Sequence, residues 1–449
     1  MFPAFFRLIG KIFFREIVIE GRENLPSSGP LILASNHPND LLDPLLTLFF
    51  SPPLRLRHIA KSTLFAVPLV GFILRRMRAI PVLRHKEAGG PVDYSSFFDE
   101  CAGALQEGDA IVIFPEGGST EAPTIGPLKT GAARIYFLAR QRGLDVPIVP
   151  VGINYEEGSI FRSSVLLHVA PPVDSSRSVA LHATDPPAAI QELTAEIHRV
   201  LGDHVFQAET FQDRELIILL ERIYSESQQG LNWADRYRRL GEFKPRVVEL
   251  RRCCRPEMAR LRRLVARYRR LARLAGTRSG DTPAPPLSAI AGAAGTLFAY
   301  TGWVFNWIPY RLVKWLVERR PLPRTDVATM TIAWSLAVFP LAYVAEGLLI
   351  GSLIGWGAGL TFGLVIVPLS YLALRYFEWR ETLGIRPPYP AALFRGRWSR
   401  RTSRRLKRLR ERIMREVERF PSTANPARDT TAHTGVPDLS QPADANPGS

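Results

Sequence analysis

The chain has 449 residues, which is too long for one ordinary domain, so we expect two or three structural units. Its 58 lysines and arginines outnumber 42 aspartates and glutamates, and the net charge of +16 indicates a polyanionic partner, either an anionic bilayer or nucleic acid. Cys101, Cys253 and Cys254 lack the spacing of a metal site, and the adjacent pair offers no ordinary disulfide, which favours a reducing compartment.

Residues 1–15 are predicted to form an amphipathic helix at a membrane interface. Basic residues recur at every fourth position and would form one stripe, opposite an apolar face that contains Phe5, Leu8 and Ile12. The segment has no small-residue cleavage site, and charges interrupt its apolar run, so we do not interpret it as a signal peptide. A plain core helix is the alternative.

Residues 16–205 alternate short apolar runs with amphipathic segments. Strands are expected at 16–21, 31–34, 56–61, 79–82, 110–114, 146–153 and 165–169. Helices are expected at 64–76, 94–106, 129–142 and 186–202. Because strand and helix alternate, the sequence predicts an α/β domain with a mostly parallel or mixed sheet and helices packed on it.

The first candidate site lies in residues 35–43. His37 follows an apolar strand, and Pro38 breaks any regular continuation, so the histidine is expected in a loop at a strand end. Asn39 or Asp40 is expected to cap the next helix, which places Asp43 in the first turn of that helix. A carboxylate there can face the imidazole and strengthen it as a general base. The alternative is a structural histidine with an aspartate that complements the helix dipole.

The second candidate site follows the apolar run 110–114. Glu116 comes directly after this strand, at the position where sites usually form in an α/β sheet. Gly117 and Gly118 follow it, and glycines let the backbone approach a ligand closely. Helix capping is the alternative role for Glu116.

Four blocks of residues, in order along the chain, carry a resemblance to a known family. They are Asn36-His37 with Asp43; Lys61 with Leu64, Pro68, Gly71, Ile80, Pro81 and Arg84; Phe114-Pro115-Glu116-Gly117 with Pro127-Leu128-Lys129 and Gly131; and Val146-Pro147-Ile148-Val149-Pro150-Val151. With these blocks, residues 15–175 resemble the phospholipid/glycerol acyltransferases. Members of that family transfer a fatty acyl group from a thioester to a hydroxyl of a glycerophosphate.

The resemblance implies roles for the matched residues. His37 would be the catalytic base and Asp43 its partner, and an acyl thioester needs no covalent enzyme nucleophile. The implied substrate-binding residues are Lys61, Arg84, Glu116, Gly117, Gly118 and Lys129, with Arg84 at the position of the phosphate-contacting arginine. No metal or cofactor is implied: the donor would be acyl-CoA or acyl carrier protein, and the acceptor a glycerophosphate or lysophospholipid.

Two features depart from the usual pattern. Five residues separate His37 from Asp43 where the family usually has four, and Gly118-Ser119-Thr120 replaces the usual Thr-Arg-Ser. Both resemble a branch that contains glycerol-3-phosphate and dihydroxyacetone-phosphate acyltransferases. They leave open whether the acceptor is glycerol 3-phosphate or its 1-acyl product.

Residues 206–275 are predicted to be a basic helical extension. Arginines between 246 and 273 recur with leucines in helical periodicity, so a helix with its apolar and basic faces would lie on an anionic membrane. A solvated helical face is the alternative. Residues 276–286, rich in Gly, Ser, Thr and Pro, are interpreted as a linker.

Residues 327–375 are predicted to be a transmembrane helical hairpin. Two apolar segments of roughly twenty or more residues, 327–350 and 353–374, are separated only by Gly351-Ser352. Basic residues flank both ends, so the positive-inside rule predicts a multi-pass membrane protein with the α/β domain on the cytoplasmic face. Residues 287–326 are interpreted as an interfacial or re-entrant helical region.

The remaining sequence is basic and then polar. Residues 376–420 are predicted to be a basic cytoplasmic helical segment, with Leu406, Leu409, Ile413 and Val417 on one face. Residues 421–449 are expected to be a disordered tail. A non-catalytic lipid-binding protein that keeps the fold is the main alternative function. Nucleic-acid binding rests on charge alone, and we do not expect a nucleic-acid partner.

Overall fold

The computed structural model describes residues 2–83, 93–225, 231–275, 289–382 and 399–419. Seven strands in this part of the chain form one sheet in the order β1-β7-β6-β2-β5-β3-β4. The strands are β1 (Glu16–Glu20), β2 (Leu31–Ser35), β3 (Leu56–Lys61), β4 (Ile80–Val82), β5 (Ala110–Ile113), β6 (Ile148–Tyr155) and β7 (Ser164–Val169). All neighbours are parallel except β6 and β7, so the predicted mostly parallel sheet is confirmed.

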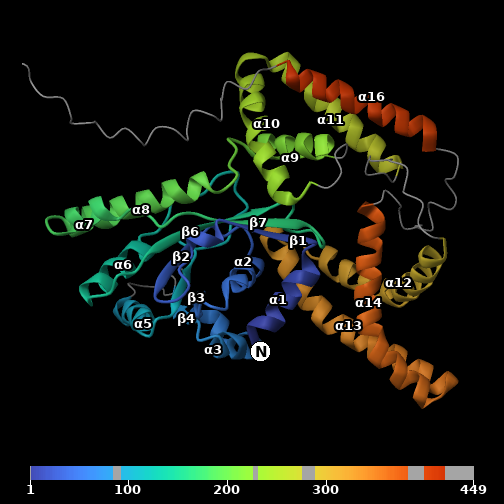
Figure 1. The fold of residues 1–449 in the computed structure, drawn as a ribbon, viewed down its shortest axis with the longest axis horizontal. Helices are drawn as coiled ribbons and strands as arrows, with labels where there is room; N and C mark the ends of the chain where they lie inside the picture. Colours follow the sequence, from blue (N-terminus) through green and yellow to red (C-terminus); the bar gives the residue numbers. More distant parts are fainter. Residues whose placement is uncertain (1, 84–92, 226–230, 276–288, 383–398, 420–449) are drawn as a thin grey trace, which may run out of the picture.

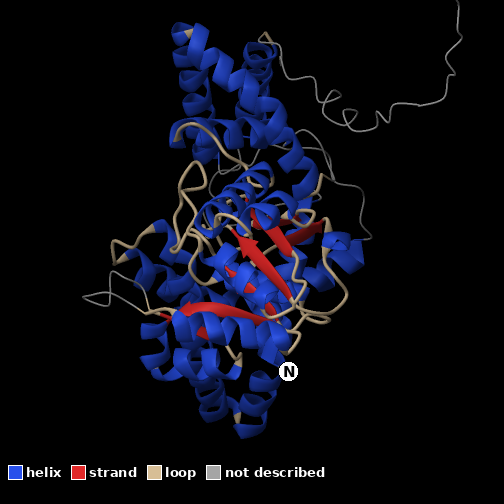
Figure 2. Cartoon of the chain, turned by 90° about the vertical axis from the view of Figure 1, so that its left-hand side faces the viewer, coloured by secondary structure: helices blue, strands red, loops and turns tan. Residues whose placement is uncertain are grey.

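Helices cover both faces of the sheet, because side chains alternate between the faces along each strand (Figure 2). Ile32 and Ile111 contribute to a core under one group of helices: α5 (Ser95–Gln106), α6 (Gly131–Gln141), α7 (Ser176–His182) and α8 (Pro186–Asp203). Leu33 and Val112 point to the other face, which is covered by α1 (Phe2–Phe13) and α2 (Leu42–Thr47). The helix α3 (Pro68–Arg76) leads into β4.

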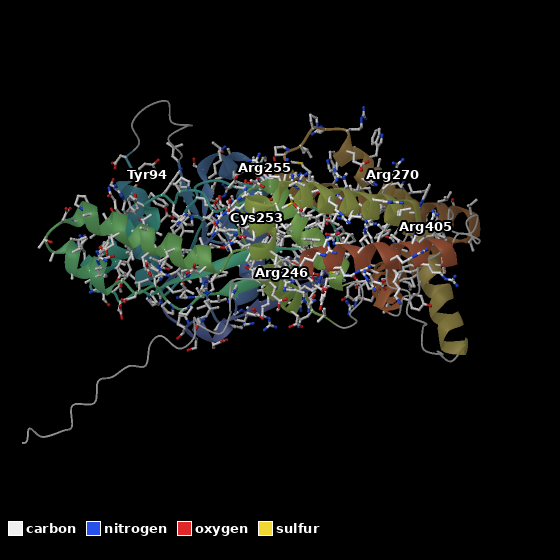
Figure 3. The ribbon with its side chains drawn as sticks, turned by 90° about the horizontal axis from the view of Figure 1, so that it is seen from above. Tyr94, Arg246, Cys253, Arg255, Arg270 and Arg405 are labelled. Carbon is white, nitrogen blue, oxygen red and sulfur yellow. The ribbon has the colours of Figure 1, made fainter. Side chains whose placement is uncertain are left out.

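Four helices, three of them rich in arginine, form a separate group, which we call the basic helical module. It comprises α9 (Phe211–Ser225), α10 (Trp233–Cys253), α11 (Arg255–Ala275) and α16 (Ser399–Glu418), and it packs on the sheet through Leu166 of β7. Figure 3 marks Arg255 and Arg270 on α11 and Arg405 on the neighbouring α16.

The module corrects the expectation that the apolar faces of its helices would lie on a membrane. Leu261 and Val265 of α11 are buried in one core with Leu406, Ile413 and Val417 of α16. The apolar faces of α11 and α16 therefore cover each other, and most of the described arginines of these two helices are exposed. A single extended helix over 246–273 was also wrong, since α10 ends at Cys253 and α11 begins at Arg255.

The C-terminal helices form a three-helix bundle. They are α12 (Ala289–Glu318), α13 (Arg324–Ile354) and α14 (Trp356–Thr382). Two of them, 324–354 and 356–378, are long and apolar enough to cross a membrane by length and composition. Only Gly355 separates α13 from α14, and the two helices project away from the sheet as a hairpin (Figure 1).

The hairpin is docked on the α/β domain at its start. Ala328 and Ile332, in the first turns of α13, are buried in the same core as α1 and α2. The predicted linker 276–286 and the tail 421–449 lie outside the described residues.

Candidate active site

The candidate site lies where parallel strands end at one edge of the sheet. His37 follows β2, and Glu116 follows β5, the strand that pairs with β2 in parallel. Lys61 is the last residue of β3, and Tyr155 is the last residue of β6. Since the carboxyl ends of parallel strands meet at one edge, the topology gathers side chains that are far apart in the sequence.

His37 and Asp43 form a hydrogen-bonded pair despite the extra residue between them. His37 Nδ1 lies 2.8 Å from Asp43 Oδ2, and the Asp43 side chain is fully buried. The backbone N–H of Asn39 donates to the same carboxylate oxygen over 2.7 Å. The loop between strand and helix thus folds around the carboxylate, and the predicted contact is present.

Asn39 binds the Asp43 carboxylate and does not occupy the N-cap position of helix α2. Helix α2 begins one or two residues later than expected, with Leu41 at the N-cap and no side-chain cap there. The Asn39 side chain reaches the Leu42 amide only over 3.4 Å. The predicted capping role of Asn39 or Asp40 is therefore wrong at that position.

Tyr155 completes the surroundings of the aspartate. Its hydroxyl donates to Asp43 Oδ1, the oxygen that His37 does not use. Burial raises the pKa of Asp43, while hydrogen bonds from His37, Tyr155 and Asn39 oppose that shift. A carboxylate with three donors is a strong partner for an imidazole, and a donating Nδ1–H leaves Nε2 as the basic atom of His37.

The His37 ring and backbone are fixed by the loop after β5. The imidazole stacks on Phe114 at a centroid distance of 4.2 Å. The backbone N–H of His37 donates to Glu116 Oε1 over 2.8 Å, and the carbonyl of His37 accepts from the Thr120 amide over 2.9 Å. The side chain of His37 is 11% exposed, so part of the imidazole remains accessible while these contacts hold the residue in place.

Glu116 therefore positions the histidine loop. Burial raises the pKa of Glu116, and hydrogen bonds from the backbone amides of His37 and Gly126 oppose that shift. Its expected contact with an acceptor remains a prediction.

Gly117 and Lys129 lie against each other. Gly117 has φ +76°, a conformation that favours glycine, and a Cβ added to it would lie 2.5 Å from Lys129 Nζ. The Gly117 amide donates to Phe114 O over 3.0 Å within the turn. It is therefore not free to bind an oxyanion in this conformation, and the Gly118 amide is the one to test for that role.

Of the residues predicted to bind the phosphate, the structure describes Lys61 but not Arg84. Lys61 lies at the correct edge, but β5 separates its strand from β2. Arg84 lies outside the described residues.

The start of the hairpin lies beside the loop that carries His37. Asp40 accepts a hydrogen bond from Ser119 and contacts the Asp326 side chain in the first turn of α13. Arg324 Nη1 lies 3.9 Å from Glu121 Oε1. The hairpin thus borders the site. No sequence pattern predicted these contacts or the hydrogen bond between Tyr155 and Asp43.

Residues 16–154 match the model of a protein family described as Acyltransferase. A chloroplastic 1-acyl-sn-glycerol-3-phosphate acyltransferase of Arabidopsis thaliana is 30% identical over 176 residues, covering 37% of this chain and 46% of that protein. Glycerol-3-phosphate O-acyltransferase 1 of Saccharomyces cerevisiae is 26% identical over 138 residues, covering 30% of this chain and 18% of the yeast protein. The chain thus spans less than half the length of these two curated relatives.

A solved structure is also similar to part of the chain. It is the crystal structure of the 1-acyl-sn-glycerophosphate acyltransferase of Thermotoga maritima. The match has a TM-score of 0.34 and 21% identity, and it covers 45% of this chain and 77% of that chain.

Proposed function

We propose that this protein is a membrane-bound O-acyltransferase of phospholipid synthesis, and the match of residues 16–154 to the Acyltransferase family model supports this proposal. It would transfer a fatty acyl group from an acyl thioester to a hydroxyl of glycerol 3-phosphate or 1-acylglycerol 3-phosphate. The observation that carries the proposal is the pair of His37 and buried Asp43, which leaves one imidazole nitrogen available as a base. Relatives with these acceptors in their names support the substrate class.

The proposed mechanism uses His37 as a general base. Nε2 of His37 removes the proton of the acceptor hydroxyl as its oxygen attacks the thioester carbonyl. Asp43 holds Nδ1–H and stabilises the imidazolium that forms. The tetrahedral oxyanion accepts a hydrogen bond from a backbone amide, for which Gly118 is the candidate. When the intermediate collapses, the C–S bond breaks and the imidazolium returns the proton to the leaving thiolate.

The membrane hairpin fits this chemistry, because the acceptor class includes lipids that reside in a bilayer. We propose that α13 and α14 cross the membrane and that the α/β domain stays on the cytoplasmic face. Both helices meet the site region, α13 at Asp40 and α14 at Arg162. Arg311, Lys314, Arg319 and Arg320 precede the hairpin and Arg375 lies near its other end, which supports a cytoplasmic location of both ends.

An assay with the full-length chain tests the function. Purified protein in nanodiscs is given acyl-CoA or acyl carrier protein as donor. Glycerol 3-phosphate, dihydroxyacetone phosphate, 1-acylglycerol 3-phosphate and lysophospholipids are the acceptors. We expect transfer to at least one glycerophosphate and a loss of at least about a hundredfold in kcat for His37→Ala, since general base catalysis contributes about 10²–10⁴-fold.

The matched control is His198→Ala, a histidine on α8, which should keep full activity. Turnover in the His37→Ala variant equal to that of the unmodified chain would exclude this mechanism. If the intact chain binds lysophospholipid but transfers nothing from either donor, a non-catalytic lipid-binding protein is the better description.

A further inference from the structure

Arg162 lies in the turn between β6 and β7 and holds the end of α1. Its backbone has φ +64°, an uncommon conformation for a residue other than glycine. Its backbone N–H donates to Phe13 O over 2.7 Å. Nη1 of its guanidinium donates to the carbonyls of Lys11, Ile12 and Phe14 over 2.9, 2.8 and 2.7 Å. A helix leaves its last carbonyls without internal partners, and here a distant arginine supplies the donors.

The other side of the same guanidinium binds the membrane hairpin. Nε and Nη2 of Arg162 both donate to Glu378, near the end of α14. The side chains of Arg162 and Glu378 are only 12% and 13% exposed. Because removal of one partner from such a pair leaves a charge without compensation, this contact fixes the end of α14 against α1.

The end of α1 leads directly to the catalytic pair. Phe14 is 1% exposed, and its ring stacks on Tyr155 at a centroid distance of 5.8 Å and an interplanar angle of 20°. The Tyr155 hydroxyl donates to Asp43, which binds His37. A continuous series of packed and hydrogen-bonded groups therefore connects Glu378 of the hairpin with the proposed base.

The Tyr155 hydroxyl acts as a hydrogen-bond donor to Asp43. Burial, and then the neighbouring Asp43 charge, raises the pKa of Tyr155 well above its usual value. The hydroxyl thus stays protonated and donates to the carboxylate. Since the hydroxyl bonds Asp43 and not His37, Tyr155 acts through another residue and does not itself touch the reacting atoms.

We propose that Tyr155 and Arg162 are positioning residues that make the alignment of His37 and Asp43 depend on the seating of the α/β domain on the membrane hairpin. Arg162 holds α14 and the last turn of α1 together, that turn places Phe14, and Phe14 places Tyr155 behind Asp43. The inference rests on the proposed acyl transfer. It goes further by assigning the hairpin a part in catalysis besides attachment to the membrane.

The first test replaces the hydroxyl that faces Asp43. In nanodiscs, with the donor and acceptor that the unmodified chain uses, Tyr155→Phe should lower kcat roughly tenfold and leave KM unchanged. The acidic limb of the pH–rate profile should move to higher pH, because Asp43 without this donor attracts the imidazolium proton more strongly.

Tyr136→Phe is the matched control, since Tyr136 is also buried and its hydroxyl bonds Ser175 over 2.7 Å. It should leave the pH–rate profile in place. A purely structural role for Tyr155 would reduce activity equally at every pH, and that result would overturn the proposal.

The second test removes the hairpin side of the ion pair. Glu378→Ala should lower kcat several-fold to tenfold for protein that remains in the nanodisc, with Glu378→Gln as a milder variant if the first folds poorly. In a Tyr155→Phe background, Glu378→Ala should have almost no further effect on kcat, because both changes interrupt the same connection. Glu196→Gln, in the exposed Arg199–Glu196 pair, is the control.

The outcomes separate the two proposals. If the unmodified chain transfers no acyl group, the proposed function fails. If it transfers normally and the two variants have independent, multiplicative effects, or if Glu378→Ala changes only the amount of protein in the membrane, the positioning role is wrong.

Discussion

The Asp43 carboxylate is surrounded by donors. Oδ2 receives the Asn39 amide and the His37 ring, and Oδ1 receives the Tyr155 hydroxyl. A carboxylate accepts on both oxygens, whereas an asparagine amide must present an NH2 group to one of these donors. The aspartate therefore selects the imidazole tautomer by its acceptor-only character.

Asp43→Asn is predicted to lower kcat at least about a hundredfold while the fold is retained, because the amide favours the wrong tautomer of His37. The measurement is the acyl-transfer rate in nanodiscs. Asp185→Asn is the control, since Asp185 only caps α8 through the Ala188 amide. If the Asp43 variant kept full activity, the histidine would not need its carboxylate.

His58 makes stability depend on pH at a second buried position. Its Nε2 lies 2.7 Å from Thr47 Oγ1, and its Nδ1 is buried without a partner among the described residues. Burial lowers the pKa of His58 to about 4 from an ordinary value of 6.5. The unfolded chain thus binds a proton as the pH falls through 6.5, and the folded chain does not, so stability is lost as the pH falls.

This linkage predicts a loss of about 2 kcal/mol in the free energy of unfolding between pH 8 and pH 5 from His58 alone. Chemical denaturation in detergent at both pH values measures it. His58→Gln should show a smaller decrease than the unmodified chain by that amount, and His198→Gln should show the same decrease as the unmodified chain. Equal pH dependence in all three proteins would contradict the assignment.

The residues of the site were predictable from sequence to different degrees. His37 and Glu116 follow strand ends, Asp43 lies in the first turn of the next helix, and a short loop is enough to bring His37 to Asp43. Tyr155 is 112 residues away from Asp43 and ends a strand of ordinary composition. Only the order of strands in the sheet brings it to the aspartate, and no local pattern contains that order.

At the scale of single elements, α1 presents an apolar face outward. Phe5 and Leu8 are 52% and 51% exposed, whereas Phe13 at the end of the helix is buried. Helix α3 likewise exposes Phe72. Exposed apolar groups of this size on an amphipathic helix are typical of an interfacial helix, and the interfacial location of residues 1–15 stays a prediction.

We predict that residue 8 lies at the boundary of headgroups and acyl chains. With Cys253→Ser and Cys254→Ser as background, a fluorophore on Leu8→Cys should be quenched strongly by brominated lipids in reconstituted protein. A fluorophore on Gln191→Cys, an exposed position of α8, should be little affected. Equally weak quenching at both positions would place α1 away from the bilayer.

Helical periodicity identified the apolar faces of α11 and α16 but not what covers them. Leu261 and Ile413 repeat with the spacing of a surface helix, and the same spacing suits a membrane or another helix. The two helices are separated in the sequence by the whole three-helix bundle, and they still bury these faces in one core. Long-range pairing of this kind cannot be derived from either segment alone.

At the scale of the whole molecule, the position of α12 bears on the number of membrane crossings that we propose. Tyr300 packs on Phe377 near the end of α14, and Val317 belongs to a cluster with Val327 at the start of α13. Between these two positions, Asn306 donates to Ser370 Oγ and accepts from the Tyr343 hydroxyl, both over 2.7 Å. Both parts of α12 thus lie toward the same end of the hairpin, and its middle contacts the interior of the two spans.

This arrangement favours a re-entrant α12 and two crossings, since a third crossing would move the basic residues after α12 to the opposite side from α11. We predict that Arg270→Cys, Arg320→Cys and Arg404→Cys, each in a background without Cys253 and Cys254, react with a membrane-impermeant maleimide from the same side. Ser352→Cys, near the tip of the hairpin, should react only from the other side. The hairpin begins beside Asp40 and ends at Arg162, and the basic helical module packs on β7 of the same sheet. The module and the base of the hairpin must therefore lie on one side of the bilayer. Reaction of Arg270→Cys and Arg320→Cys from opposite sides would refute both this topology and the packing of α12.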